Sequence, residues 1–232
     1  MRLIRFLSAS KPYGALGGRG KNWLASSLTG LLMLGGPSFA EPVEIVALGD
    51  SLTAGYGLAP DDGFVPQLQR WLRTNGADVT VVNAGVSGDT TAGALARLDW
   101  ALSTTADAVI VTLGGNDLLR GLSPAEAKGN LEAILSNISQ RGLPVLLVPI
   151  SAPGNYGADY KADFDAIYPE LASRYEAQLS APFLNPILAL PDRNSAMATY
   201  VQPDGLHPNA KGVALVVESL GPNVQALLTK IN

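Results

Sequence analysis

The sequence contains no cysteine and only one histidine, His207, among its 232 residues. Without cysteine the chain has no thiol nucleophile, no disulfide and no cysteine ligand for a metal. One histidine excludes a three-histidine zinc site, and any acid–base chemistry by an imidazole must involve His207. Charged residues are also few, at 16%, against 47% hydrophobic residues. This composition and length are typical of one globular domain with a buried core.

The first forty residues lack acidic side chains and carry five basic ones: Arg2, Arg5, Lys11, Arg19 and Lys21. An apolar run follows at 23–34, and mostly small residues lead up to Ala40. This order is typical of a secretory signal peptide. We therefore expect residues 1–40 to be removed by cleavage after Ala40, and the protein to be periplasmic or secreted. The apolar run is too short for a stable membrane span, so an uncleaved or interfacial helix is the alternative.

Signal cleavage would also change the charge of the protein. The whole chain has a formal charge of −4, and the cleaved chain would keep 11 basic and 20 acidic residues, a formal charge of −9. Binding to nucleic acid needs clustered lysine and arginine side chains against the phosphates. We therefore expect no nucleic-acid partner.

Apolar runs alternate with stretches of helical spacing along residues 41–232, which we expect to form a single domain. Strands are predicted at 43–48, 79–82, 108–113, 145–150 and 183–184. Helices are predicted at 64–74, 92–102, 124–141, 167–179 and 210–228. This alternation predicts a parallel sheet with helices on both faces. Five strands fit the flavodoxin-like order 2-1-3-4-5.

Glycine-rich loops follow three of the predicted strands, at 49–51, 85–88 and 114–117. In parallel sheets of this kind, ligands bind at the carboxyl ends of the strands. Glycine lets the backbone come close to a ligand and adopt conformations that other residues avoid. We therefore expect the functional site at these loops, although glycine-rich turns also end strands in many α/β proteins without any such role.

Ser51 follows the first of these loops at an expected helix N-terminus, where serine most often serves as a cap. A catalytic serine needs an imidazole to accept its proton and a carboxylate to orient that imidazole. Asp204 and His207 are the candidates for these groups, since Gly205 allows a tight turn that would bring the carboxylate back onto the ring. Taken alone, a histidine before proline is more often a surface residue. The G-x-S-x-G, P-loop and G-x-G-x-x-G patterns are absent after the predicted strands, which weakens the other hydrolase and nucleotide-binding interpretations.

Acyl transfer places negative charge on the carbonyl oxygen of the substrate, and fixed N–H donors must meet it. The candidate donors are the backbone of Ser51, the backbone of Gly88 and the side-chain amide of Asn116. Each lies after a different predicted strand. The alternatives are a plain tight turn for Gly88 and an amide bonded to its own backbone for Asn116.

Four segments of the chain occur in the order that is found in the GDSL/SGNH hydrolase family: Gly49-Asp50-Ser51-Leu52, Gly88, Gly115-Asn116-Asp117 and Asp204-x-x-His207. Residues 83–90, 113–117 with 119–121, and 155–157 with 166–169 further resemble its bacterial multifunctional acyl-CoA thioesterase/lysophospholipase/arylesterase subgroup. The resemblance covers about residues 44–220. It implies a three-layer α/β/α sandwich (the SGNH hydrolase fold), periplasmic export, and neither a metal nor an organic cofactor.

The same resemblance implies a role for each site residue. Ser51 would be the nucleophile, Asp204 and His207 would complete a catalytic triad, and Ser51, Gly88 and Asn116 would form the oxyanion hole. The implied protein is a serine hydrolase that cleaves carboxylic esters and acyl thioesters. We expect it to be a monomer that acts on small-molecule acyl substrates.

Two alternative functions remain open: a carbohydrate O-acetyl esterase, and a binding module that keeps the fold without activity. The small number of aromatic residues after the strand ends argues against a sugar platform, and the complete set of site residues argues against a binding module. One residue departs from the subgroup, because Thr112 stands where a glutamate is expected. We expect it to affect substrate preference or strand packing.

The acyl chain is expected to lie between the loop 117–122 and the insertion 152–168, because specificity in such folds resides in the loops around a rigid sheet. Leu118, Leu119 and Leu122 are expected to be exposed and to contact the hydrocarbon. Tyr156 and Ile167 are expected on the opposite side. Ordinary packing of the three leucines is the alternative.

Overall fold

Five parallel strands form the centre of the structure, a computed structural model that describes residues 41–102 and 105–231. The strands are β1 (Val43–Gly49), β2 (Val79–Gly85), β3 (Ala108–Thr112), β4 (Val145–Leu147) and β5 (Gln178–Leu179). Their order across the sheet is β2-β1-β3-β4-β5, and every neighbouring pair is parallel. The predicted flavodoxin-like order is therefore confirmed.

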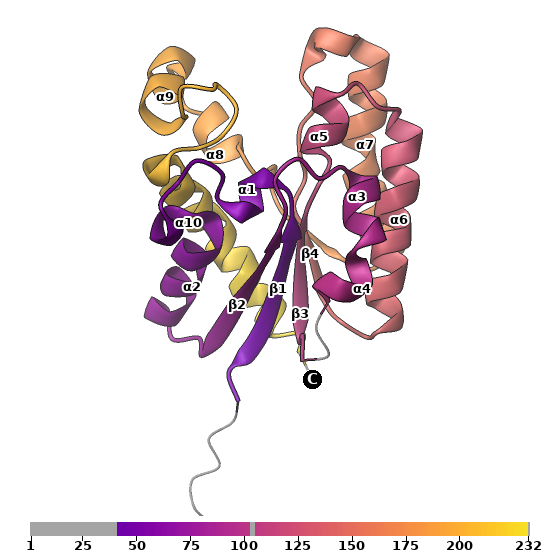
Figure 1. Cartoon of the computed structure of the whole chain (residues 1–232), viewed down its shortest axis with the longest axis vertical. Coiled ribbons are helices and arrows are strands. Elements are labelled where there is room, and N and C mark those ends of the chain that lie inside the picture. Colours follow the sequence, from indigo (N-terminus) through magenta and orange to yellow (C-terminus); the bar gives the residue numbers. More distant parts are fainter. Residues whose placement is uncertain (1–40, 103–104, 232) are drawn as a thin grey trace, which may run out of the picture. The chain divides into compact units, whose positions relative to one another are not determined.

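Helices cover both faces of this sheet (Figure 1). One face is covered by α3 (Thr91–Ala96), α4 (Leu98–Ala101), α6 (Pro124–Gln140) and α7 (Ala158–Arg174), and the other by α2 (Phe64–Thr74) and α10 (Ala210–Leu228). Along β1, Leu48 packs on the first face and Ala47 on the second, because successive side chains of a strand point to opposite sides. Burial on both faces explains the unbroken apolar strands and confirms the three-layer α/β/α sandwich.

Three strands end level with one another at the carboxyl edge of the sheet. Gly49, the last residue of β1, pairs with Gly85 of β2 and with Thr112 of β3. Four short helices lie at this edge: α1 (Ser51–Ala54), α5 (Gly115–Leu119), α8 (Asn185–Leu188) and α9 (Arg193–Tyr200). The register of the sheet thus gathers the loops after β1, β2 and β3 around one point.

The segment between β4 and α10 departs from the prediction. Helix α7 spans Ala158–Arg174 instead of 167–179, and the fifth strand is Gln178–Leu179 instead of 183–184. Phe164 already belongs to the buried face of α7, but the exposed polar residues around it weaken the helical pattern in the sequence. Phe183 packs against the Phe64 ring, with 5.2 Å between ring centroids, and does not pair in the sheet.

Three smaller differences concern the boundaries of elements and short helices that were not predicted. The predicted helix at 92–102 is interrupted at Arg97, which separates α3 from α4. Strand β4 ends at Leu147, two residues before Pro149, whose missing N–H cannot join the ladder. Helices α5, α8 and α9 had no counterpart among the predicted helices, and α1 begins at Ser51, where a helix start was expected.

The expected signal peptide, with its cleavage after Ala40, lies outside the described residues. The chain from Glu41 onward clusters as one compact unit. Among the helices in the described part of the chain, none is both long enough and apolar enough to cross a bilayer.

Candidate active site

Ser51, His207 and Asp204 come together at the carboxyl edge of the sheet. The Nε2 atom of His207 lies 2.8 Å from Oγ of Ser51, and its Nδ1 lies 2.6 Å from Oδ2 of Asp204. Both distances are those of hydrogen bonds, so the ring bridges the hydroxyl and the carboxylate. Serine and histidine are 156 positions apart in sequence, and the fold alone unites them. A hydroxyl, an imidazole and a carboxylate in this order can pass a proton from the hydroxyl to the ring.

The N-terminus of α1 presents Ser51 to this ring. The side chain of Asp50 accepts a hydrogen bond from the Leu52 N–H at 3.0 Å and so caps the helix. Capping is the commoner role of a serine at such a position, but here the preceding aspartate fulfils it. The Ser51 hydroxyl therefore contacts His207.

Two glycines let α1 pack directly on the strand ends. A Cβ atom on Gly49 would lie 2.0 Å from Oγ1 of Thr53, and one on Gly85 would lie 2.4 Å from the backbone nitrogen of Ala54. Either contact is far too short for a side chain. We expected these glycines to let the backbone approach a ligand, whereas the structure shows that they make room for the helix that carries Ser51.

A tight turn holds Asp204 against His207. Gly205 has a φ of +72°, a conformation that favours glycine. The Oδ1 atom of Asp204 accepts hydrogen bonds from the N–H groups of Leu206 at 2.9 Å and His207 at 3.0 Å. Its Oδ2 atom is thereby aimed at the ring. The Tyr56 ring lies 4.8 Å from the imidazole, centroid to centroid, and limits its movement further.

The surroundings of Asp204 keep its carboxylate ionised. Desolvation alone would raise its pKa, but hydrogen bonds from Leu206 and His207 outweigh this effect and lower the pKa to about 2. The folded-state value is thus below the ordinary 3.8. This group therefore stabilises the fold above about pH 4 and loses that contribution as the pH falls towards 2. An ionised Asp204 can balance a positive charge on the imidazole.

Asn116 and Gly88, the two other predicted donors, lie next to each other. The Nδ2 atom of Asn116 donates to the Asp89 carbonyl at 2.9 Å and lies 3.5 Å from Oδ2 of Asp50. The second contact is long and therefore weak, so this amide hydrogen can turn to a substrate oxygen. Gly88 directly precedes Asp89 and has a φ of +87°. Asn116 lines the cavity described below, whereas Gly88 is not part of its lining.

Asp50 is a buried carboxylate that the sequence analysis did not single out. Its side chain lies between Ser51 and Asn116, and the residue is 1% exposed. Burial raises its pKa to about 6, although the hydrogen bond from Leu52 and the nearby His207 lower it. A charged group in such surroundings costs stability. Its position directly before the serine is the only signal in the sequence.

Replacing Asp50 by asparagine should stabilise the folded protein at pH 8 but not at pH 4. The pKa of about 6 exceeds the ordinary 3.8, so the folded state holds the proton more tightly and loses stability as the pH rises between these values. Asparagine caps as well and carries no charge. The free energy of unfolding should therefore rise at pH 8 by at most about 3 kcal/mol. Urea unfolding of both proteins at pH 4 and pH 8 measures the difference, and an equal effect at both would contradict it.

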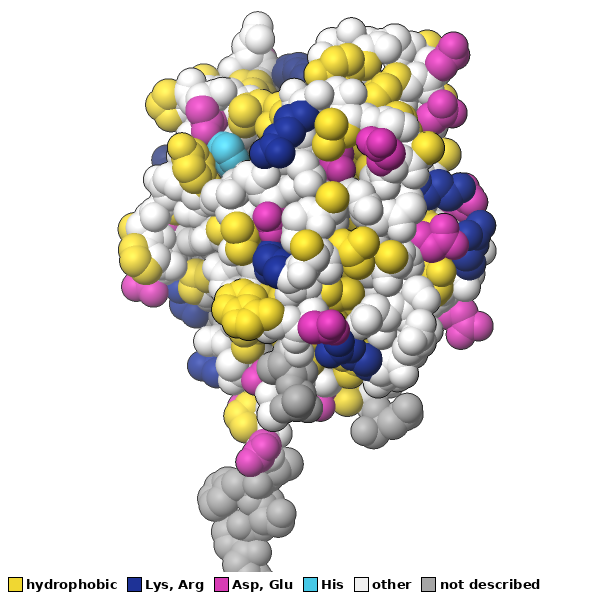
Figure 2. Space-filling model, turned by 45° about the vertical axis from the view of Figure 1, so that its right-hand side comes forward, with side chains coloured by type: hydrophobic (Ala, Val, Ile, Leu, Met, Phe, Trp, Pro, Cys, Tyr) yellow, Lys and Arg dark blue, Asp and Glu magenta, His cyan; other side chains and the backbone are white. Residues whose placement is uncertain are grey.

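A cavity of about 350 Å³ opens beside Ser51 and His207. This volume lies in the range of small-molecule sites. Figure 2 shows the histidine, in cyan, at the surface with hydrophobic side chains beside it. Three segments supply most of the apolar lining: α5 with Leu118 and Leu119, the segment after β4 with Tyr156, and the region of α8 and α9 with Leu188, Met197 and Val201.

The expected walls of an acyl site are found in part. Leu119 and Tyr156 line the cavity and are 58% and 42% exposed. Leu118 also lines it but is buried, so the expectation that it is exposed was wrong. Leu122 is not part of the lining, and Ile167 lies on the buried face of α7 in the core, so both were misplaced.

The wall formed by α8 and α9 was not predicted from the sequence. The start of α9 carries one usable signal, because the Asp192 side chain accepts a hydrogen bond from the Ser195 N–H at 3.1 Å, as an N-cap does. Thr112, where a glutamate is expected in the subgroup, is fully buried in β3 and does not line the cavity. It therefore belongs to strand packing.

The fold and the Ser–His–Asp arrangement are those of a flavodoxin-like α/β hydrolase. Residues 47–215 match the GDSL-like lipase/acylhydrolase family, and the chain belongs to that family. It is 35% identical over 206 residues to esterase TesA of Pseudomonas aeruginosa. The match covers 88% of this chain and 98% of that protein. It is 34% identical over 186 residues to thioesterase 1/protease 1/lysophospholipase L1 of Escherichia coli K12, covering 79% of this chain and 84% of that protein.

A solved structure agrees with these relatives. AlinE4, an SGNH-hydrolase family esterase, is 44% identical to this chain and superposes with a TM-score of 0.66. The match covers 82% of this chain and 99% of AlinE4. The resemblance seen in the sequence is therefore confirmed. The protein is an ester-cleaving enzyme and not a binding module without activity.

Proposed function

We propose that this enzyme is a secreted serine hydrolase that cleaves carboxylic esters and acyl thioesters through an acyl-enzyme on Ser51. The contact of one imidazole, that of His207, with both Ser51 at 2.8 Å and Asp204 at 2.6 Å carries the proposal. These three groups form the proton path that a nucleophilic serine needs. The names of the relatives, esterase and thioesterase, support the two kinds of substrate.

The reaction begins when Oγ of Ser51 attacks the carbonyl carbon and its proton passes to Nε2 of His207. Asp204 balances the charge that the ring acquires. The N–H groups of Ser51 and Gly88 and the amide of Asn116 meet the negative carbonyl oxygen. Breaking the C–O or C–S bond then releases an alcohol or thiol, which takes the proton from His207. A water molecule repeats these steps on the acyl-enzyme, and the carboxylic acid leaves.

The cavity favours a hydrocarbon acyl group over a sugar. Leu119, Leu188 and Met197 present apolar surface beside Ser51, and Tyr156 is the only phenylalanine, tyrosine or tryptophan side chain among the lining residues. Sugar sites rely on aromatic faces, and this lining offers only that of Tyr156 among mostly apolar residues. A carbohydrate O-acetyl esterase is therefore the weaker candidate.

On p-nitrophenyl esters and acyl-CoA thioesters of increasing chain length, kcat/KM should rise up to about fourfold per methylene until the cavity is full. Each buried methylene contributes about 0.8 kcal/mol, which sets this factor. Leu119→Asp should lower kcat/KM for octanoyl esters at least about tenfold and change acetyl esters by about twofold at most. The reason is that Leu119 lies on the cavity wall, where its side chain would contact the acyl chain.

Leu179→Asp is the matched control, because Leu179 is also exposed, at 39%, but lies in β5 away from the cavity. It should leave both substrates unaffected. An equal loss on short and long esters in Leu119→Asp would show that Leu119 supports the fold and does not contact the acyl chain. Activity restricted to acetylated sugars would favour the carbohydrate esterase.

Export and a monomeric state belong to the same proposal. The basic, apolar and small segments of residues 1–40 support a signal peptide that is cleaved after Ala40. The mature enzyme would then act in the periplasm or outside the cell on small-molecule acyl substrates. No metal or organic cofactor enters the proposed steps.

A further inference from the structure

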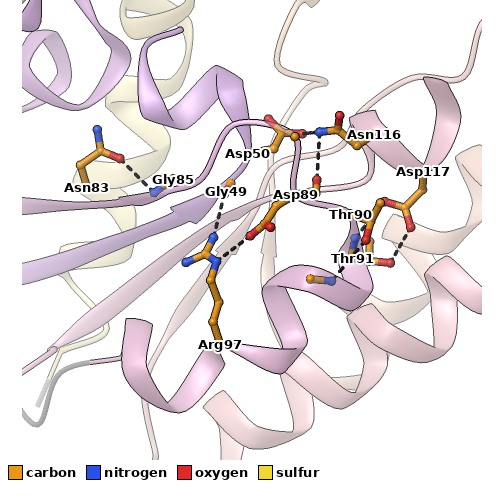
Figure 3. Close-up of polar contacts among 12 residues, drawn as sticks. Gly49, Asp50, Asn83, Gly85, Asp89, Thr90, Thr91, Arg97, Asn116 and Asp117 are labelled. Atoms are coloured by element: carbon orange, nitrogen blue, oxygen red, sulfur yellow. Dashed lines mark hydrogen bonds and ion pairs between the residues drawn. The ribbon is translucent and has the colours of Figure 1, made fainter. Parts of the chain in front are cut away.

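From the break between α3 and α4, the guanidinium of Arg97 contacts the end of β1 and the loop after β2 (Figure 3). Its Nε donates to Oδ2 of Asp89 at 2.6 Å, and its Nη2 donates to the Gly49 carbonyl at 3.1 Å. The side chains of Arg97 and Asp89 are each only 17% exposed. Such a shielded, charge-assisted contact fixes the geometry of the groups that it joins.

These two contacts connect the parts of the site that react with the substrate. Gly49 lies two residues before Ser51, the proposed nucleophile. Asp89 directly follows Gly88, and its carbonyl accepts the hydrogen bond from Asn116 at 2.9 Å. One guanidinium thus links the turn that carries the nucleophile to the loop that carries Gly88 and holds the Asn116 amide.

The other side of the same loop is tied to α5. The Nη2 atom of Arg120 donates to the Gly88 carbonyl at 2.9 Å. Asp117 accepts hydrogen bonds from the backbone nitrogen of Thr91 at 2.9 Å and from its hydroxyl at 2.6 Å. These contacts hold the loop against α5, and Arg97 adds the side-chain link to β1.

We propose that Arg97 is a positioning residue of the hydrolytic reaction, which sets the spacing between Ser51 and the donors at Gly88 and Asn116. This inference rests on the proposed function and extends it to a residue outside the cavity lining. The donors must meet the oxygen in the transition state, so their displacement weakens transition-state stabilisation more than substrate binding. A displacement of about 1 Å can cost about 10²-fold in rate.

The test compares Arg97→Met, which removes both contacts, with Arg97→Lys, which keeps a charge for Asp89 without the planar fork. For Arg97→Met, kcat on a short ester should fall by about tenfold to a hundredfold with KM within about threefold, and Arg97→Lys should recover part of the loss. Arg141→Met is the control, because Arg141 pairs with Asp99 and Asn137 away from the strand ends. It should change kcat by about twofold at most.

A second measurement separates positioning from mere support of the fold. In an Asn116→Ala background, Arg97→Met should cost less than in the wild type, because one of the donors that it positions is already missing. The same factor in both backgrounds would overturn the proposal. So would unchanged kcat in a folded Arg97→Met, or unfolding of both Arg97 variants in a thermal melt. A wild-type protein that is inactive on esters would overturn the proposed function as well.

Discussion

Ser51→Ala should abolish ester hydrolysis without unfolding the protein. The substitution removes the Oγ atom that lies 2.8 Å from Nε2 of His207, and with it the proposed nucleophile. Where three residues act as one unit, the loss of the nucleophile costs about 10⁶ in kcat, and only substrate binding and the oxyanion donors remain. The helix should keep its start, because Asp50 caps α1 through the Leu52 N–H. Hydrolysis of an aryl ester by the purified variant measures the loss.

The control for this variant is Ser173→Ala, which removes an exposed hydroxyl on α7 far along the chain from the site. It should retain wild-type activity, and both variants should melt within a few degrees of the wild type, since one hydrogen bond contributes about 1 kcal/mol. A fluorophosphonate probe should label the wild type and the control but not Ser51→Ala. Activity within tenfold of the wild type in a folded Ser51→Ala would refute the assignment.

Periodicity and helix-end signals in the sequence correctly predicted the two helices α2 and α10. Helix α2 occupies the predicted residues, and Asn75 and Gly76 end it, the latter with a φ of +87°. Helix α10 also occupies the predicted residues, because the Asn209 side chain caps it through the N–H groups of Lys211 and Gly212. Local patterns suffice to predict such helices, since residues close together in the sequence form both the apolar face and the cap.

Tertiary contacts account for what the sequence did not predict. The run 92–102 has the composition of one helix, but the contacts of Arg97 with Asp89 and Gly49 accompany a break at its centre. Burial of Asp50 depends on the packing of α1 against the strand ends and on Asn116 from α5. No local pattern predicts the break at Arg97 or the burial of Asp50, because each depends on contacts between separate segments of the chain.

The catalytic candidates could be identified from the sequence for a different reason. With one histidine in the chain, every proton path through an imidazole had to use His207, and its spacing from Asp204 fits a turn. The sequence could not provide the distances to Ser51 or the third wall of the cavity. The α8 and α9 wall comes from short helices with a few apolar residues, which give little periodic signal.

Asp204→Asn should reduce kcat by about 10⁴ while the protein stays folded. The carboxylate accepts from the N–H groups of Leu206 and His207 through Oδ1, and an asparagine oxygen can keep these bonds. Its amide would then face Nδ1 of the ring, which lies 2.6 Å from Oδ2 in the wild type. Because an amide donates where the carboxylate accepts, the ring proton would move to Nε2. In that tautomer the imidazole can no longer take the proton of Ser51.

The ionisation of Asp204 defines what differs between the wild type and Asp204→Asn. Its pKa of about 2 means that the wild-type residue is charged throughout the neutral range, so the variant differs by a full charge and a reversed hydrogen bond. Asp99→Asn, which removes a surface carboxylate paired with Arg141, is the control and should retain full activity. Fluorophosphonate labelling of Ser51 should slow in parallel with hydrolysis, because both need the same base. Labelling at the wild-type rate in Asp204→Asn would show that Asp204 does not set the tautomer of His207.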